Sequence, residues 1–333
     1  MNVALIGCGL IGRKRAEALR AFPEDKLVVV CDTDESRAGA FARDYACANE
    51  AEWGKAIGRL DVDGVINSTI NSSLAEITVF ALNAGKHVLC EKPLGRNTTE
   101  ARAMTTAARA HGLNLKTGFN HRFHPAVAEA KRKVEEGSIG RVVTIRVRYG
   151  HGGRKGMESE WRASKELSGG GELLDQGVHV IDLIRWFGGE VTEVYGNVET
   201  KIWDIPVEDN AFGILKTDRG VTAMFHVSWT NWRNVFSLEI LGETGYLSID
   251  GLGGSYGVER LEVGKRKPEG GRPDIRVVEF NGEDVSWKKE WEEFRNSIAE
   301  HRPPIGNGVD GLRANEIIEA LYESSRTHAS VTV

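Results

Sequence analysis

Residues 3–12 read Val3-Ala4-Leu5-Ile6-Gly7-Cys8-Gly9-Leu10-Ile11-Gly12, an apolar run followed at once by three spaced glycines. Apolar residues then recur at helical spacing, through Ala16 and Leu19. The segment is therefore expected to fold as strand, glycine turn and helix. In that arrangement the first glycine makes a tight turn, the second leaves room for a pyrophosphate, and the third lets the helix pack on the strand.

A second apolar run, 27–31, ends before Asp32, which lies 20 positions after the last glycine of the motif. At this spacing a carboxylate can accept hydrogen bonds from the ribose hydroxyls of a dinucleotide whose phosphates face the helix N-terminus. The following Thr33-Asp34 adds a carboxylate where NADP would need an arginine, and Arg37 is the one nearby counter-argument. The sequence predicts a dinucleotide site that favours NAD over NADP.

Composition predicts an enzyme of two domains that is not bound to a membrane. Of the 333 residues, 41% are hydrophobic and 27% charged, and no apolar stretch approaches the roughly 20 residues that span a bilayer. The net charge of -5, without a basic tail, argues against nucleic acid or a membrane surface as partner. The four cysteines lack metal or disulfide spacing, and a strand is expected from the second residue in place of a leader, so we expect a cytoplasmic protein without a metal site.

Strands and helices alternate through residues 1–120. Beyond those already named, strands are expected at 64–68, 87–90 and 114–118, and helices at 36–45, 74–84 and 99–111. Such alternation predicts an α/β domain with a parallel, doubly wound sheet whose ligands lie beyond the carboxyl ends of the strands.

After residue 120 the pattern changes to strand-like runs with few helices between them. They are 142–149, 191–200, 211–216, 221–229, 236–242, 246–249 and 276–280. We expect a second, α+β domain, 121–333, with an open-faced, mainly antiparallel sheet. Aromatic residues around Phe225, Trp229 and Trp232 suggest that the open face is covered, and a homodimer or homotetramer formed through this sheet is a hypothesis.

A candidate catalytic pair follows the glycines at 169–171, where an apolar-periodic helix carries Asp175 and His179. Four residues are one helical turn, so both side chains are expected on one face. A carboxylate beside an imidazole raises the basicity of the ring and orients it, while the glycines would let a ligand approach the backbone. This pattern is typical of a general base with its orienting partner; the alternative is a buried pair that locks the helix into the core.

Two further segments follow strands of the first domain and are expected near the nicotinamide end of the cofactor. Glu91-Lys92-Pro93 comes directly after the strand 87–90, so the Lys92 ammonium would emerge at the carboxyl edge of the sheet. Asn120-His121-Arg122 comes after the next strand and would line the same cleft. For Lys92 the alternative is a solvated lysine before a turn proline.

Together these motifs resemble the Gfo/Idh/MocA family, and the resemblance covers nearly the whole chain. It implies an N-terminal Rossmann domain, a C-terminal open-faced sheet, and a pyridine-nucleotide oxidoreductase acting on a hydroxyl of a sugar or cyclitol. In the roles that the resemblance implies, His179 takes the proton of the substrate hydroxyl as hydride leaves for the nicotinamide, Asp175 stabilises the imidazolium, and Lys92 holds the oxygen.

The expected site comprises two sets of residues. Those expected to bind the cofactor are Gly7, Gly9, Leu10, Ile11, Gly12, Asp32, Thr33, Ser68, Thr69, Asn71, Glu91, Lys92 and Asn120. Those expected to bind the substrate are Lys92, His121, Arg122, His151, Arg154, Trp161, Arg162, Asp175 and His179.

Two positions depart from the family pattern. The turn Ser68-Thr69-Ile70-Asn71 replaces a threonine-proline-asparagine turn, so its contact with the nicotinamide ribose is less defined. Arg15 replaces a histidine on the first helix; its charge could help to bind the pyrophosphate, or the side chain could face solvent.

Local charge bears on the substrate. Residues 141–165 contain seven basic and two acidic side chains, which favours an anionic substrate such as a sugar phosphate, nucleotide sugar or uronate, with a neutral hexose or inositol as the alternative. Trp161 could stack on a sugar ring. Two other classes of function stay open: a lyase or hydrolase that works by transient oxidation with retained NAD, and a non-catalytic nucleotide-binding sensor.

Overall fold

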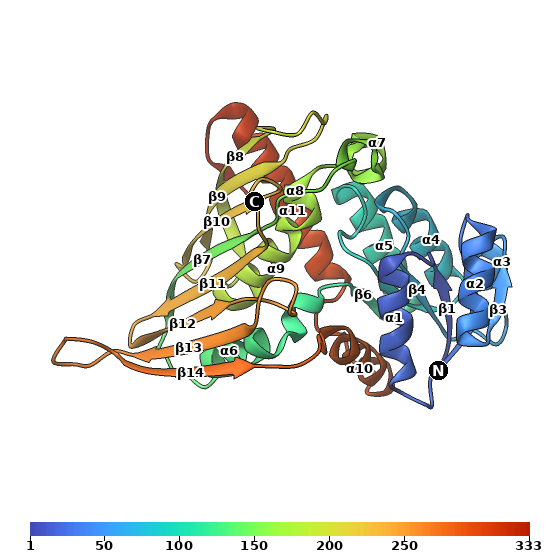
Figure 1. Cartoon of the computed structure of the whole chain (residues 1–333), viewed down its shortest axis with the longest axis horizontal. Coiled ribbons are helices and arrows are strands. Elements are labelled where there is room, and N and C mark those ends of the chain that lie inside the picture. The colour runs from blue at the N-terminus through green and yellow to red at the C-terminus, as the bar shows by residue number, and fades with distance from the viewer. The chain divides into compact units, whose positions relative to one another are not determined.

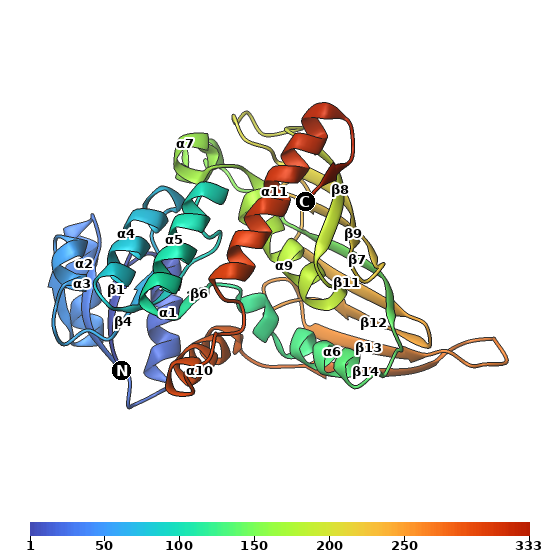
Figure 2. The ribbon, with the colours of Figure 1, turned by 180° about the vertical axis from the view of Figure 1, so that it is seen from behind.

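The computed structural model describes residues 1–333, which form two compact units. Unit 1 comprises Met1–Asn120, Glu166–Gly169 and Trp287–Asn315. Unit 2 comprises His121–Lys165, Gly170–Ser286 and Glu316–Val333. Unit 1 therefore contains a helix from the last sixth of the chain as well as the N-terminal segment (Figures 1 and 2).

Unit 1 is built on a six-stranded parallel sheet in the order β3-β2-β1-β4-β5-β6. Its strands are β1 (Asn2–Ile6), β2 (Lys26–Cys31), β3 (Ala48–Glu50), β4 (Gly64–Asn67), β5 (His87–Cys90) and β6 (Leu115–Thr117). Its helices are α1 (Leu10–Arg20), α2 (Glu35–Tyr45), α3 (Trp53–Ile57), α4 (Asn71–Asn83), α5 (Thr98–His111), α7 (Lys165–Ser168) and α10 (Ser286–Ala299). The doubly wound parallel sheet predicted for the N-terminal part is confirmed, and its strand order reverses between β1 and β4, where such folds bind ligands.

Helices cover both faces of this sheet, which is why β1, β2, β4 and β5 consist mostly of apolar residues. Along β1, Ala4 and Ile6 face a core that contains residues of α3, α4 and α5. Val3 and Leu5 face a second core with residues of α1, α2 and α10, including the buried Trp291. Both cores hold the carboxyl ends of the strands at one edge of the sheet.

Unit 2 is built on a nine-stranded sheet in the order β14-β13-β12-β11-β7-β10-β9-β8-β15. Its strands are β7 (Val142–Gly150), β8 (Val191–Glu199), β9 (Asn210–Thr217), β10 (Thr222–Ser228), β11 (Val235–Gly242), β12 (Gly245–Asp250), β13 (Glu259–Lys265), β14 (Asp274–Phe280) and β15 (Val331–Thr332). The remaining helices of the chain are η1 (Asn120–Phe123), α6 (Pro125–Glu135), η2 (Met157–Ser159), η3 (Trp161–Ala163), α8 (Glu172–Asp175), α9 (Gly177–Gly188) and α11 (Gly308–Thr327). All strand pairs are antiparallel except β7 with β10, so the mainly antiparallel sheet is confirmed.

One face of this sheet packs on α6 and α9, and the other is open (Figure 2). Of the three aromatic residues named from the sequence, Phe225 and Trp229 do not lie on the open face as expected, whereas Trp232 is exposed in the loop after β10. The Phe225 ring packs under Gly213 on the helix-covered face and Trp229 is 1% exposed, because each occupies an inward position of the strand alternation or of the loop that follows it. The open face is formed instead by other apolar side chains, among them Tyr195, Phe212, Ile214 and Met224.

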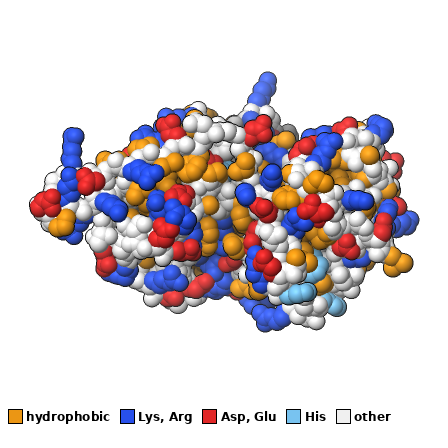
Figure 3. Space-filling model, turned by 90° about the horizontal axis from the view of Figure 1, so that it is seen from below, with side chains coloured by type: hydrophobic (Ala, Val, Ile, Leu, Met, Phe, Trp, Pro, Cys, Tyr) orange, Lys and Arg blue, Asp and Glu red, His pale blue; other side chains and the backbone are white.

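The surface carries charges of both signs. Basic and acidic side chains are interspersed with hydrophobic ones on the face seen in Figure 3. No helix combines the length and the apolar character that crossing a bilayer requires. No group of three or more His, Cys, Asp or Glu side chains is arranged to hold a metal ion.

Candidate active site

The glycine motif forms a tight turn between β1 and α1. Gly7 has φ +95°, a conformation that residues with a Cβ rarely adopt, and a Cβ at Gly12 would lie 2.1 Å from the Gly7 carbonyl oxygen. At Gly9, by contrast, a Cβ would meet no protein atom within 4 Å. Gly9 is the N-cap of α1, so space for a ligand lies beside the unpaired N–H groups of the helix N-terminus. The turn fits the pyrophosphate of a dinucleotide.

Asp32 lies at the carboxyl end of β2 and is fixed by backbone contacts. Its Oδ2 accepts a hydrogen bond from the Cys8 N–H at 2.7 Å, and its Oδ1 accepts one from the Asp34 N–H at 2.9 Å. Arg37, which could have argued for NADP, pairs with the carboxylates of Asp32 at 3.4 Å and Asp34 at 3.2 Å. Thr33 is exposed beside them. This carboxylate stands beside the glycine turn, as binding of an adenosine ribose requires.

The loop after β4 lies against the same turn. The Ser68 hydroxyl donates to the Gly7 carbonyl at 2.8 Å, and the Thr69 hydroxyl donates to the Asn67 side-chain oxygen at 2.8 Å. Asn71 begins α4 and is buried, with its side-chain amide donating to the Ser168 carbonyl at 2.8 Å. These polar groups therefore shape the loop through contacts within unit 1.

Glu91 and Lys92 follow β5 at the same edge of the sheet. Glu91 is 6% exposed, and Lys92 is half-buried with a cis peptide bond to Pro93. Asn120, after β6, is also buried. Because parallel strands end at one edge, the structure brings together the cofactor-binding residues predicted from five separate strands.

Arg15 is 1% exposed, so the prediction that its side chain faces solvent is wrong. Its guanidinium contacts the carboxylates of Glu91 and Glu290 and is thus committed to partners inside unit 1. Sequence reasoning missed Glu290, which lies on α10, 275 positions away from Arg15.

In unit 2, the segment that carries Asp175 and His179 is two helical pieces where one continuous helix was expected. α8 ends at Asp175 and α9 begins at Gly177, with Gln176 between them. His179 lies in the first turn of α9 and is 4% exposed. Asp175 pairs with Arg162, whose Nε is 3.3 Å from its Oδ2. Orientation of His179 by Asp175 stays a prediction.

The glycines before these helices serve protein packing and do not open a path for a ligand as expected. A Cβ at Gly170 would lie 2.3 Å from the Tyr322 hydroxyl, and one at Gly171 would lie 1.9 Å from the Glu208 carbonyl oxygen. Close packing of neighbouring chain segments, which the sequence pattern does not reveal, therefore explains these two glycines.

His179 lies in a cluster of buried rings that the sequence did not indicate. The His121 ring stacks on the His179 ring, with centroids 3.7 Å apart and planes 16° apart. Tyr149 is 5.3 Å from His121 and 5.1 Å from Tyr256, between ring centroids. Burial, with the neighbouring Tyr256, raises the pKa of Tyr149 well above its usual value. Gln176, directly before α9, donates to the Tyr256 hydroxyl at 2.9 Å. The one feature of the sequence that could have placed Tyr149 near this cluster is its position at the end of a predicted strand, just before the loop that contains His151.

Arg122 is buried and forms a two-pronged ion pair with Asp182, its Nε 2.8 Å from Oδ2. Its guanidinium also lies 5.2 Å from the Trp186 ring centroid. These contacts tie the segment after β6 to α9. Arg122 thus has protein partners on the helix that carries His179.

The basic segment 141–165 is largely neutralised by carboxylates. Its ion pairs are Arg141–Glu243, Arg146–Glu239, Arg154–Glu160 and Arg162–Asp175. Arg162 also lies over the Trp161 ring, 4.4 Å from its centroid. His151 accepts a hydrogen bond from the Gly153 N–H at 2.9 Å, and burial lowers the pKa of its ring below the usual value.

The glycine turn, the carboxylate after β2 and the lysine after β5 together define a dinucleotide-dependent oxidoreductase. Comparison with known proteins specifies the family. Residues 1–119 match an oxidoreductase family described by its NAD-binding Rossmann fold, and residues 127–248 match the GFO/IDH/MocA C-terminal domain. The chain belongs to the GFO/IDH/MocA oxidoreductase family, as its motifs indicated.

Similar proteins are named for reactions of sugars. The chain is 34% identical over 231 residues to levoglucosan dehydrogenase of Pseudarthrobacter phenanthrenivorans, a match that spans 66% of this chain and 59% of that protein. It is 32% identical over 320 residues to 1,5-anhydro-D-fructose reductase of Ensifer adhaerens, a match that spans 92% of this chain and 91% of that protein. A solved structure of levoglucosan dehydrogenase in complex with NADH has a TM-score of 0.92 and 27% identity, covering 100% of this chain and 99% of that one.

Proposed function

We propose that the protein oxidises a ring hydroxyl of a sugar or sugar derivative, with NAD as hydride acceptor and His179 as the base. The observation that carries the proposal is the place of His179, a buried imidazole stacked on a second ring in the first turn of α9. A ring held in this way keeps one orientation toward a bound substrate, as general-base catalysis requires. The names of the two similar proteins above support a sugar as substrate.

Each residue has a role in this proposal. Bound NAD would supply the acceptor for the hydride that leaves the carbinol carbon. His179 accepts the hydroxyl proton at a ring nitrogen as the carbon–oxygen double bond forms. Lys92 holds the oxygen and stabilises its negative charge, and Asp175 stabilises the imidazolium. The glycine turn and Asp32 bind the pyrophosphate and the adenosine ribose.

Of the two classes of substrate, we favour a neutral one. Arg154 and Arg162, the arginines expected to grip an anion, pair with Glu160 and Asp175. An anionic substrate would have to displace one of these carboxylates. An anionic sugar is the second candidate, because Arg162 remains about one-third exposed beside Trp161.

The test is nicotinamide absorbance with NAD, and separately NADP, across neutral sugars, inositols, sugar phosphates, uronates and nucleotide sugars. Turnover of neutral sugars with NAD is expected, whereas turnover confined to the anionic ones would reject the neutral preference. His179→Ala should lower turnover by about 100-fold or more with NAD affinity retained. His328→Ala, which changes an exposed histidine, is the matched control. No turnover with any substrate despite tight NAD binding would reject the dehydrogenase in favour of transient oxidation or a sensor.

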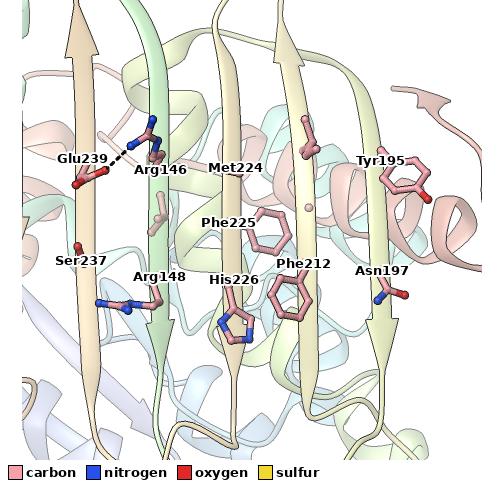
Figure 4. A pocket seen from close by; sticks show the side chains of 13 residues that line it. Arg146, Arg148, Tyr195, Asn197, Phe212, Met224, Phe225, His226, Ser237 and Glu239 are labelled. Atoms are coloured by element: carbon pink, nitrogen blue, oxygen red, sulfur yellow. Dashed lines mark hydrogen bonds and ion pairs between the residues drawn. The ribbon is translucent and has the colours of Figure 1, made fainter.

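We further propose that a second copy of the chain covers the open face of the sheet in unit 2. Tyr195, Phe212, Ile214 and Met224 lie on the neighbouring strands β8, β9 and β10 and are 43% to 48% exposed. Tyr195, Phe212 and Met224 are labelled in Figure 4. The Phe212 and His226 rings stack on this face, with centroids 4.1 Å apart and planes 4° apart. Light scattering should give a mass of two or four chains, and Ile214→Glu should lower it. A wild-type mass of one chain would reject the proposal.

A further inference from the structure

Arg15 is the centre of a buried charge network in unit 1. Its Nε lies 2.7 Å from Glu91 Oε1, and its Nη1 lies 2.5 Å from Glu290 Oε2. The guanidinium also stacks over the Trp287 ring, 4.6 Å from its centroid. α1, the segment after β5 and α10 therefore meet at one side chain.

The network is balanced in charge. Lys116, 0% exposed, lies 3.5 Å from the other carboxylate oxygen of Glu290, so two cations face two carboxylates. Burial alone would lower the pKa of Arg15, but the charges of Glu290 and Glu91 outweigh this effect and raise it. Well-packed apolar residues often stabilise a protein core at least as much as buried ion pairs do. Stability alone therefore does not explain why the chain has a charge network here.

The network reaches the reactive edge of the sheet through Glu91. One oxygen of this carboxylate contacts Arg15, and the other accepts a hydrogen bond from the Lys92 backbone N–H at 3.3 Å. The guanidinium thereby fixes the carboxylate, and the carboxylate fixes the peptide unit from which the Lys92 side chain projects.

We propose that Arg15 and Glu290 are positioning residues for Lys92, acting through Glu91. The proposal rests on the proposed function, in which Lys92 holds the substrate oxygen. It assigns a catalytic consequence to a C-terminal helix through Glu290, whose side chain is fully buried. Misplacement of a reacting group by about 1 Å can slow an enzyme about 100-fold, so a network of this kind can matter without touching substrate.

A purely structural role, in which the charges only clamp α1 to α10, is the competing explanation. Single variants do not separate the two, because Arg15→Met leaves an uncompensated carboxylate and Glu290→Gln an uncompensated cation. The double variant Arg15→Met/Glu290→Gln removes one charge of each sign, so that the negative charge of Glu91 and the positive charge of Lys116 remain in the network. It restores the charge balance while Glu91 still lacks its partner.

We expect the double variant to regain most of the Tm that either single variant loses. Its kcat should nevertheless stay about tenfold or more below that of the wild type, with NAD affinity within about twofold, because Lys92 is misplaced while the glycine turn is intact. The control is Arg20→Met, which changes an exposed side chain on α1 and should leave Tm and kcat unchanged. A double variant with wild-type kcat would overturn the proposal.

Hydrogen exchange provides a readout that needs no substrate. In the double variant the Lys92 amide should exchange about tenfold faster, since its acceptor is no longer fixed, while amides of β1 keep wild-type rates. Unchanged exchange at Lys92 would overturn the positioning role, and faster exchange throughout unit 1 would assign the network to stability alone. If the wild type oxidises no sugar, the proposed function fails, yet this measurement still decides whether Arg15 and Glu290 hold Lys92.

Discussion

The imidazole rings of His121 and His179 lie face to face, 3.7 Å between centroids, and both are almost fully buried. His121 directly follows Asn120 after the last strand of the parallel sheet, whereas His179 lies on α9. A flat ring against a flat ring leaves the His179 imidazole little freedom to rotate. The sequence predicted both residues in the site but not this contact.

Removal of the stacked ring should therefore slow the reaction. We expect His121→Ala to lower kcat/KM about tenfold or more for the sugar that the wild type oxidises, because His179 loses its orientation. His121→Phe, which keeps a flat ring, should retain most of the activity. Steady-state kinetics of the two variants checks this prediction. A Phe variant as slow as the Ala variant would show that His121 acts through its nitrogens instead.

The glycines of the motif should separate cofactor binding from folding. A Cβ at Gly9 meets no protein atom, so Gly9→Ala should keep Tm within about 2 °C while weakening NAD binding about tenfold or more. Gly12→Ala should lower both, because its Cβ would collide with the Gly7 carbonyl. Thermal unfolding and a fluorescence titration with NAD measure the two effects. Unchanged NAD affinity in Gly9→Ala would contradict a pyrophosphate position beside this glycine.

Asp32 should decide between the two nicotinamide cofactors. In Asp32→Ser the carboxylate that would repel a 2′-phosphate is gone, and Arg37 loses one of its two partners. We expect the ratio of NADP to NAD affinity to rise about tenfold or more. Asp34→Ser, which changes the more exposed carboxylate, should shift that ratio less. Equal shifts in the two variants would mean that local charge, and not the position of Asp32, sets the preference.

Elements with strong local patterns could be predicted from the sequence. The run Val3–Gly12 and the alternation after it identified five strands of the parallel sheet close to their observed ends. β13 could not be predicted, because Leu261 and Val263 are its only large apolar residues among charged ones. β3 and β15 have three and two residues and depend on pairing with a neighbouring strand.

The site was predictable only where a motif is contiguous. The candidate residues Gly7, Asp32 and Lys92 follow from local spacing together with the rule that parallel strands end at one edge, and the candidate base His179 follows from its spacing to Asp175. The partners of Arg15 depend on a helix 275 positions away, so no local pattern could show that this arginine is buried. Three of the ion pairs of the basic segment join it to carboxylates outside it, those of Glu243, Glu239 and Asp175, which is why its summed charge suggested an anion site.

Glu259 should link stability to acid pH. It is buried on β13, and its carboxylate accepts hydrogen bonds from the His124 ring at 2.7 Å and from the N–H groups of Ala126 and Gly253. Burial alone would raise its pKa, but the hydrogen bond and charge of His124 outweigh burial and lower the pKa below the usual 4.5. Asp284, 3.8 Å from the His124 ring, is the other acidic group in this cluster.

A lowered pKa in the folded state means that the unfolded chain binds the proton more readily. The stabilisation by Glu259 is therefore complete above about pH 4.5 and is lost as the pH falls through the folded-state value. Glu259→Gln should be less stable than the wild type by about 2 kcal/mol at pH 7. The difference should shrink as the pH falls below about 4.5, because the unfolded wild-type chain then takes up a proton at this carboxyl, and it should be smallest once the folded-state carboxyl is protonated as well. Urea unfolding of both proteins from neutral to acid pH measures the difference, and one that stayed constant across this range would show that the carboxylate charge contributes nothing at this position.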